Sequence, residues 1–200
     1  MPPGIVIQGD SWLEQFVLSA VNQSVSTAVI VVKSALTPRS NLDLLERLVS
    51  TTPNLVFLLE EKSQNFPAAI NQGIRATQTE CVGLLLSDDW LEETAVAESV
   101  RKSADIVSSG TLVHFANGDL NELASRTPSM QAFLSFKTIE EKASYLQHFF
   151  LFRKECLLRV GGLHESIGNY PGIDDYDLIC TLLERALPSQ SDLSLSLSRS

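Results

Sequence analysis

Residues 81–100 read CVGLLLSDDWLEETAVAESV, an apolar run that ends at Ser87-Asp88-Asp89 and is followed by residues typical of a helix. Six mostly apolar residues without polar alternation are typical of a strand that is buried on both faces of a parallel sheet. Ligands of such sheets bind outside the carboxyl ends of the strands. The two adjacent carboxylates are therefore predicted to lie where a ligand would bind.

Working outward from this stretch, apolar runs and helical patterns alternate along the first half of the chain. Strands that alternate with helices are typical of βαβ units with right-handed crossovers. The first half therefore predicts an α/β fold with a mostly parallel central sheet flanked by helices. The strands are expected at residues 5–7, 28–32, 54–61 and 81–86, and the helices at residues 11–23, around 42–49 and at 67–77.

The second half of the chain is less regular. Residues 188–200 are Ser-rich with little to pack, and we expect them to form a flexible tail. The remaining strands are predicted at residues 104–109, 111–116 and 148–153, and the helices at 128–136, 139–147, 154–163 and 174–187.

The composition is that of one α/β domain with a core of its own: 200 residues, of which 44% are hydrophobic and 20% charged. The net charge of -9 argues against nucleic acid as the main partner, because phosphate binding needs basic patches.

Cys81, Cys156 and Cys180 stand too far apart for a disulfide framework or a zinc site, and Cys81 and Cys180 are predicted to be small core residues in a reducing compartment. Neither a membrane span nor a signal peptide is visible, so we expect a cytoplasmic protein.

The Ser87-Asp88-Asp89 cluster has two readings. In the first, Asp89 is the N-cap of the following helix and Glu92, three residues later, completes a capping box. In the second, Asp88 or Asp89 holds a divalent cation, since Mg²⁺ prefers one or two carboxylates together with phosphate oxygens. Such a cation would neutralise a diphosphate leaving group.

The segment GIDDYDL, residues 172–178, has a similar ambiguity. Asp174 can cap the helix that follows, with Asp177 completing a capping box or favouring the positive end of the helix dipole. Alternatively, Asp174 or Asp175 is a general base, because two adjacent like charges favour retention of a proton by one of them. The two readings are compatible, since a capping carboxylate at a cleft is already positioned.

Five segments in order resemble those of family 2 glycosyltransferases with the GT-A fold, from Ile5 to about Ala186. They are SAVNQSV (19–25), with a Ser-x-x-x-Gln pattern; NFPAAINQGIRATQTECVGLLLSDDWLEE (65–93), with the Asn-x-Gly helix and the metal loop; SADIVSSGTLVHFANGD (103–119); FFLFRKECLLRVGGLHESIG (149–168), with the Gly-Gly turn; and GIDDYDLICTLLERA (172–186). The resemblance implies transfer of a sugar from a nucleotide-diphosphate donor to an acceptor hydroxyl, usually with inversion. It implies one GT-A-like domain over residues 1–187, with a nucleotide-binding half (1–90) and an acceptor half (91–187).

The resemblance also implies roles for particular residues. Asp175 would be the base that deprotonates the acceptor, with Asp174 in place of the family's usual Glu. Gly161 and Gly162 would shape the acceptor side, with Glu165 nearby. The donor is predicted to be bound by Gln8, Asn71, Ser87 and Asp88, and Mg²⁺ or Mn²⁺ by Asp88 and Asp89. Lys33 is predicted to pair with a donor phosphate on its charge alone, and the alternative is a solvated side chain.

The chain also departs from the family pattern. The Asp-x-Asp motif reads Leu86-Ser87-Asp88, and the aspartates expected after Val32 are replaced by Lys33-Ser34-Ala35-Leu36. No His follows the last helix, and His164, which replaces an Asp of the family, is predicted to lie at a cleft edge or on the surface. These losses keep a second function open, a degenerate GT-A domain that binds a ligand or partner without catalysis. We also consider a homo-oligomer in which a partner chain supplies a C-terminal segment.

Two other enzyme classes rank lower. A nucleotidyltransferase with a similar sheet usually has a Gly-rich, Arg-containing phosphate loop after the first strand, and IVIQGDSW (5–12) has one Gly and no Arg. A Rossmann oxidoreductase would show Gly-x-Gly-x-x-Gly at the same place.

Overall fold

The computed structural model describes residues 4–8, 13–33, 37–59, 65–86, 89–113, 124–126, 129–146, 149–167, 174–186 and 195–197. Its strands are β1 (Gly4–Gln8), β2 (Ala28–Lys33), β3 (Leu55–Leu59), β4 (Cys81–Leu86), β5 (Ile106–Ser108), β6 (Thr111–Val113), β7 (Ala124–Arg126), β8 (Phe150–Arg153) and β9 (Leu195–Leu197). Its helices are α1 (Leu13–Val21), α2 (Arg39–Thr51), α3 (Phe66–Ala76), α4 (Ala95–Arg101), α5 (Met130–Ser135), α6 (Ile139–Tyr145), α7 (Lys154–Val160) and α8 (Asp174–Ala186), with a 3-10 turn η1 (Glu165–Ile167).

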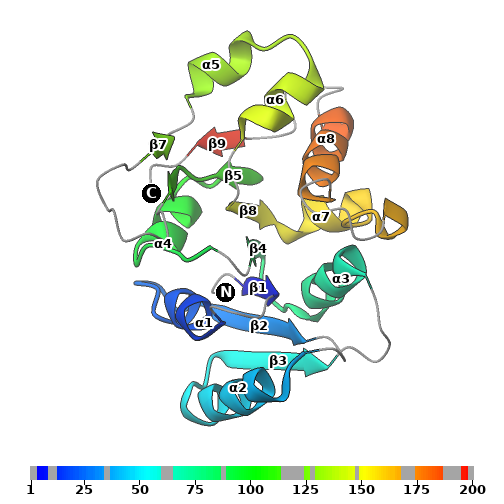
Figure 1. Ribbon diagram of the computed structural model, residues 1–200. Helices are drawn as coiled ribbons and strands as arrows, with labels where there is room; N and C mark the ends of the chain where they lie inside the picture. The colour runs from blue at the N-terminus through cyan, green and yellow to red at the C-terminus, as the bar shows by residue number, and fades with distance from the viewer. Residues whose placement is uncertain are drawn as a thin grey trace.

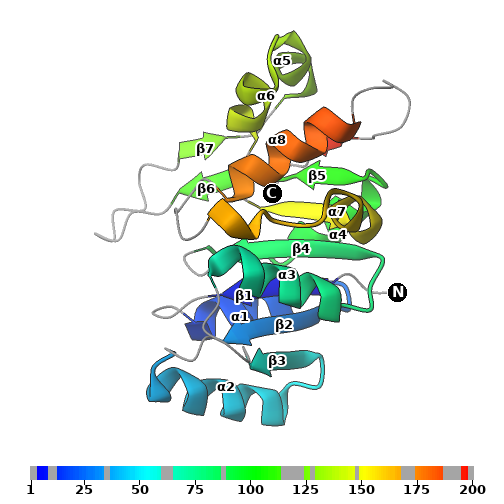
Figure 2. The same cartoon turned by 90° about the vertical axis from the view of Figure 1, so that its right-hand side faces the viewer.

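Seven of these strands form the central sheet in the order β3-β2-β1-β4-β8-β5-β9 (Figure 1). Strands β3, β2, β1 and β4 follow one another upward in the view of Figure 2. Strands β1 to β4 are mutually parallel, β8 is antiparallel to both of its neighbours, and β9 is parallel to β5. Strands β6 and β7 form a separate antiparallel pair. The predicted α/β fold with a mostly parallel central sheet is confirmed.

Helices cover both faces of the sheet, with α1 and α4 on one side and α3, α7 and α8 on the other (Figure 1). Strand β2 shows why its sequence is apolar throughout: Val29 and Val31 belong to the core cluster under α1 and α2, whereas Ile30 and Val32 belong to the cluster under α3 and α8. Since side chains alternate across a strand, only a strand buried on both faces needs an unbroken apolar run.

The structure differs from the predicted elements in three places. The strand β7 was not predicted, and Leu195–Leu197 of the Ser-rich segment form β9 against β5 rather than a featureless tail. Both strands are three residues long, too short for a periodic signal, and pairing with a partner strand decides their conformation. The helix after the Asp88-Asp89 cluster also begins later than expected, at Ala95.

The three cysteines are free thiols within or beside the core: Cys156 is buried, and Cys81 and Cys180 are half-buried. Burial raises the pKa of all three thiols. Because the thiolate is the reactive form, we expect iodoacetamide at pH 7.5 to modify the native protein much more slowly than the same protein in guanidinium chloride. Mass spectrometry over time checks this, and equal rates in the two states would contradict it.

Candidate functional site

The strand order creates a topological switch point between β1 and β4. The chain builds β1, β2 and β3 in one direction across the sheet and then places β4 on the other side of β1. Crossovers on opposite faces leave a crevice at the carboxyl ends of the two central strands, where ligands of open α/β sheets bind. Gln8 ends β1 and lies opposite Leu86, which ends β4. The Ser87-Asp88 pair, which lies outside the described residues, follows directly on Leu86.

Lys33 ends the neighbouring strand β2. Gly4 pairs with Ala28 and Ile7 with Val31, so Lys33 lies one residue beyond the row of Gln8. The backbones of the predicted donor residues Gln8 and Lys33 therefore end at the same edge of the sheet as β4. The side chains of both residues, like Ser87 and Asp88, lie outside the part of the chain that the structure describes.

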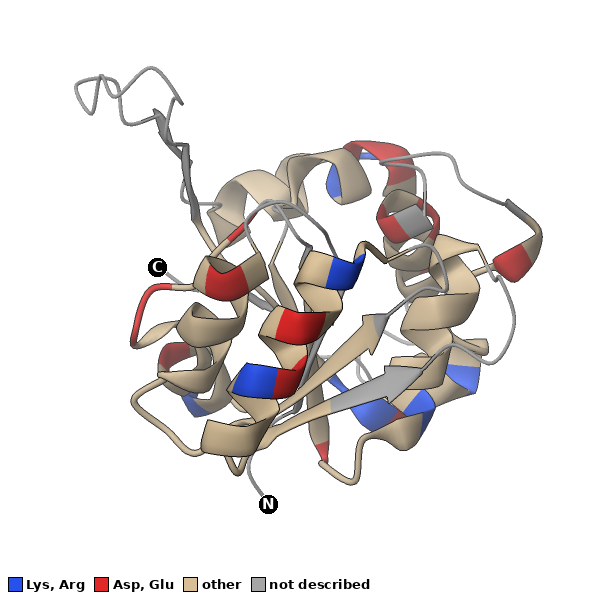
Figure 3. Ribbon diagram, turned by 60° about the horizontal axis from the view of Figure 1, so that its bottom comes forward, with Lys and Arg blue, Asp and Glu red and all other residues tan. Residues whose placement is uncertain are grey.

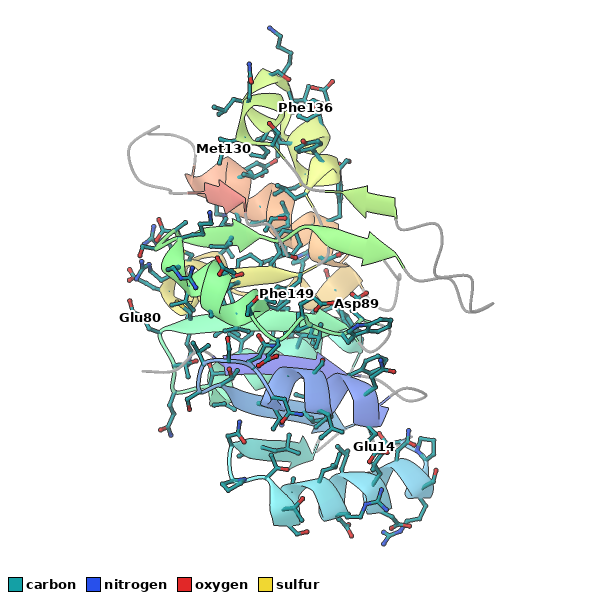
Figure 4. All side chains as sticks on the ribbon, turned by 90° about the vertical axis from the view of Figure 1, so that its left-hand side faces the viewer. Glu14, Glu80, Asp89, Met130, Phe136 and Phe149 are labelled. Atoms are coloured by element: carbon teal, nitrogen blue, oxygen red, sulfur yellow. The ribbon has the colours of Figure 1, made fainter. Side chains whose placement is uncertain are left out.

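Asp89 is half-buried at this edge, and Glu80 marks the opposite end of β4 (Figure 4). The prediction that Asp89 caps the next helix is wrong. Helix α4 begins at Ala95, its N-cap is Thr94, and no side chain caps it. Residues 89–94 are not helical, and tertiary hydrogen bonds bind the Leu91 N–H and the Glu92 carbonyl within this segment.

These hydrogen bonds come from the Ser-x-x-x-Gln pattern, in which Ser19 lies on α1 and Gln23 lies two residues beyond the end of this helix. Ser19 Oγ accepts from the Leu91 backbone N–H at 3.1 Å. Gln23 Nε2 donates to the Glu92 carbonyl at 2.9 Å and Gln23 Oε1 accepts from the Val96 N–H at 3.0 Å. The end of α1 thereby holds the segment that follows Asp88 and Asp89. The spacing of Ser19 and Gln23 does not by itself reveal this role, since Glu92, the partner of Gln23, lies 69 residues away in the chain.

Asn71 lies on α3, on the other face of the sheet, and is 3% exposed. Its side chain binds the backbone of Leu163 and the carboxylate of Glu165, just after the Gly161-Gly162 turn. Gly161 has φ +89° and Gly162 has φ +78°, so both need the left-handed conformation that glycine adopts freely. Asn71, a predicted donor-binding residue, therefore bonds the loop that follows the turn predicted to shape the acceptor side.

The second carboxylate cluster lies at the start of α8. The helix begins at Asp174 itself, so Asp174 is the first helical residue rather than a preceding cap. Asp175 is half-buried, and its Oδ1 accepts from the Tyr176 N–H at 2.9 Å. Burial raises the pKa of the Tyr176 phenol. His164, predicted to be a cleft-edge or surface residue, is exposed.

A charged cluster at the opposite edge of the sheet serves the fold. Arg153, at the end of β8, bonds Asp105 through Nε at 2.8 Å and Glu80 through Nη1 at 2.5 Å. The hydrogen bond to Asp105 is the main reason that the pKa of Arg153 is raised. The cluster ties β8 to the residues before β4 and β5, which aligns the antiparallel strand. Elsewhere, Lys and Arg are interspersed with Asp and Glu among the described residues (Figure 3).

No group of three or more His, Cys, Asp and Glu side chains that could hold a metal ion occurs among the described residues, which exclude Asp88. Asp89 is the predicted metal ligand that the structure does describe. Within the described part of the chain, every helix is too short or too polar to cross a membrane.

The model of glycosyl transferase family 2 matches residues 8–161, which span the β1–β4 switch point, Asn71 and Asp88. The chain belongs to this family. The matched range ends at the Gly-Gly turn, so Asp174 and Asp175 lie beyond it. No curated protein sequence matches the chain.

Solved structures similar to this family 2 chain are GT-A glycosyltransferases. S. aureus TarS 1–349 in complex with UDP has a TM-score of 0.69 and 15% identity over 100% of this chain. The mannosyltransferase PcManGT from Pyrobaculum calidifontis, in complex with GDP-Man and Mn²⁺, has a TM-score of 0.68 and 18% identity over 99% of this chain. The chain spans 60% of the first structure and 55% of the second. At these identities the likeness shows the fold, which is GT-A.

Proposed function

We propose that this family 2 chain transfers a sugar from a nucleotide-diphosphate donor to an acceptor hydroxyl, with inversion and with the help of a divalent cation. The observation that carries the proposal is the family match over residues 8–161. The sheet supports it, because the ends of β1 and β4 lie side by side at the switch point where a nucleotide would bind. The similar structures hold UDP in one case and GDP-Man with Mn²⁺ in the other.

Asp175 is proposed to take the proton of the acceptor hydroxyl. The acceptor oxygen then forms a bond to the anomeric carbon on the face opposite the leaving group, and the bond from that carbon to the diphosphate oxygen breaks. The diphosphate leaves with the electron pair. Attack from the opposite face inverts the anomeric centre. Asp174 precedes the base at the start of α8, where the helix dipole favours carboxylates.

On the donor side, Gln8, Lys33, Ser87 and Asp88 are proposed to contact the nucleotide sugar from the ends of three neighbouring strands. Asp88, together with Asp89, would hold Mg²⁺ or Mn²⁺. One or two carboxylates completed by phosphate oxygens suit these cations, which fits the single Asp retained at the Asp-x-Asp position. The cation would offset the charge of the leaving diphosphate. The cytoplasmic location and the homo-oligomer remain predictions from the sequence.

A second candidate is a GT-A domain that binds a ligand or partner without catalysis. The observation in its favour is the loss of carboxylates on the donor side, where Lys33-Ser34-Ala35-Leu36 replace the aspartates expected after Val32 and Leu86 replaces the first aspartate of Asp-x-Asp. The two candidates differ in whether metal and nucleotide bind together.

Thermal unfolding in the presence of UDP, GDP and their sugars, each with and without Mn²⁺, tests the proposal. A ligand that binds only the native state at 100 times its dissociation constant adds about 2.7 kcal/mol of stability. We expect a rise in Tm that needs both Mn²⁺ and one nucleotide and that disappears in Asp88→Ala. The control Asp43→Ala removes an exposed aspartate on α2 and should keep the shift. The absence of a shift with all of these ligands would favour the non-catalytic binding domain.

A further inference from the structure

We infer that Asn71 is a positioning residue: it fixes the loop from Gly161 to Glu165 and does not contact the nucleotide. The importance of this loop for the acceptor rests on the proposed function. The conformation of the loop does not, because it is argued from contacts between α3 and the loop that the structure describes.

Every polar atom of the Asn71 side chain has a partner in this loop. Nδ2 donates to the Leu163 carbonyl at 2.8 Å and to Glu165 Oε1 at 2.9 Å, and Oδ1 accepts from the Leu163 N–H at 2.8 Å. The Leu163 N–H can only donate, so the orientation of the amide is determined. Both Asn71 N–H groups are in use, so neither is left to donate to a phosphate or a ribose.

The fit between the side chain and the turn is close. A Cβ added to Gly162 would lie 2.2 Å from Asn71 Oδ1, so only glycine allows the two segments to approach this far. Leu163 is 3% exposed, and its backbone groups would lack water if Asn71 were removed. The turn and the asparagine therefore form one unit.

Two further residues of the α3 segment hold the same loop. Asn65, the N-cap of α3, accepts from the Ala68 N–H and donates through Nδ2 to the Glu165 carbonyl at 2.5 Å. Arg75 lies 4.0 Å from Glu165 Oε1, but both side chains are more than half exposed, so this pair contributes little. Asn71 is thus the buried centre of the contact.

This contact joins the two predicted halves of the domain. Asn71 belongs to the nucleotide-binding half, and Leu163 and Glu165 belong to the acceptor half and lie between α7 and α8. The loop leads to α8, where Asp175 lies.

Amide hydrogen exchange followed by NMR tests the inference in the whole chain. In Asn71→Leu, which removes all three hydrogen bonds, the Leu163 amide should exchange about tenfold faster or more, while the amides of Val31 and Leu85 in the central strands stay protected. Asn71→Asp keeps only the acceptor and should show an exchange rate for the Leu163 amide between those of wild type and Asn71→Leu. This variant also keeps the test decisive if Asn71→Leu unfolds the protein. Adding Glu165→Gln to Asn71→Asp restores an amide donor opposite the carboxylate and should slow the exchange again.

The matched control is Arg75→Gln, which removes a contact to the same Glu165 from the same helix and should leave Leu163 exchange within about twofold of wild type. Dissociation constants for UDP and GDP with Mn²⁺ are measured in parallel and should also stay within about twofold in Asn71→Asp. Unchanged Leu163 exchange in Asn71→Leu overturns the inference, as does tenfold weaker nucleotide binding with an intact loop. If wild type binds neither nucleotide, the proposed function fails, and the exchange rates still decide the role of Asn71.

Discussion

Replacing Asp175 with asparagine is expected to lower the rate of sugar transfer about 10²- to 10⁴-fold, the range in which general bases contribute. Asparagine keeps the shape and the acceptor oxygen that bonds the Tyr176 N–H, but it cannot take a proton from the acceptor hydroxyl. The loss should therefore appear in kcat and leave binding of the nucleotide unchanged. The rate is measured as UDP or GDP released from whichever nucleotide sugar the protein turns over.

The control for this experiment is Glu184→Gln, an exposed carboxylate near the other end of α8. It should retain wild-type rates, which shows that loss of charge on the helix is not itself the cause. Full activity in Asp175→Asn would remove Asp175 as the base and leave Asp174 as the alternative. Weaker nucleotide binding in the same variant would instead place Asp175 on the donor side.

Replacing Gln23 with alanine is expected to lower the free energy of unfolding by about 2–3 kcal/mol, because buried backbone groups lose their partners. Gln23 is 8% exposed and Val96, whose N–H it accepts, is fully buried. The Glu92 carbonyl loses its donor in the same variant. Urea unfolding should show a lower midpoint with an unchanged m-value. Since residues 91–96 begin three positions after Asp88, binding of a nucleotide with Mn²⁺ should weaken as well.

Gln15→Ala is the matched control for this variant. Gln15 is the same residue type on α1, the helix that ends two residues before Gln23, but it is exposed, and alanine is the better helix former, so stability should stay within about 0.5 kcal/mol. If Gln23→Ala were as stable as Gln15→Ala, the hydrogen bonds of Gln23 would not be what holds the segment after β4.

Local patterns predicted the helices and strands of the first half because each of them has an apolar run or stripe long enough to be periodic. β2 is a clear example, since burial on both faces requires the unbroken run Ala28–Val32. The same reasoning failed for β7 and β9, whose three residues have no period, and for the capping box at Asp89. The spacing from Asp89 to Glu92 fits a capping box, but in the structure Ser19 accepts from the Leu91 N–H and Gln23 donates to the Glu92 carbonyl.

The sequence by itself determined the α/β class, the carboxylates that follow β4 and begin α8, and the family to which the chain belongs. It did so because side-chain periodicity and motif order are local properties. Only the tertiary structure decided that β4 lies beside β1, which brings Gln8 opposite Leu86, and that Asn71 binds Leu163 across 92 residues. These are choices of strand order and side-chain partner. They depend on the packing of segments far apart in the chain. The spacing of residues within one segment therefore does not reveal the strand order or the distant side-chain partners.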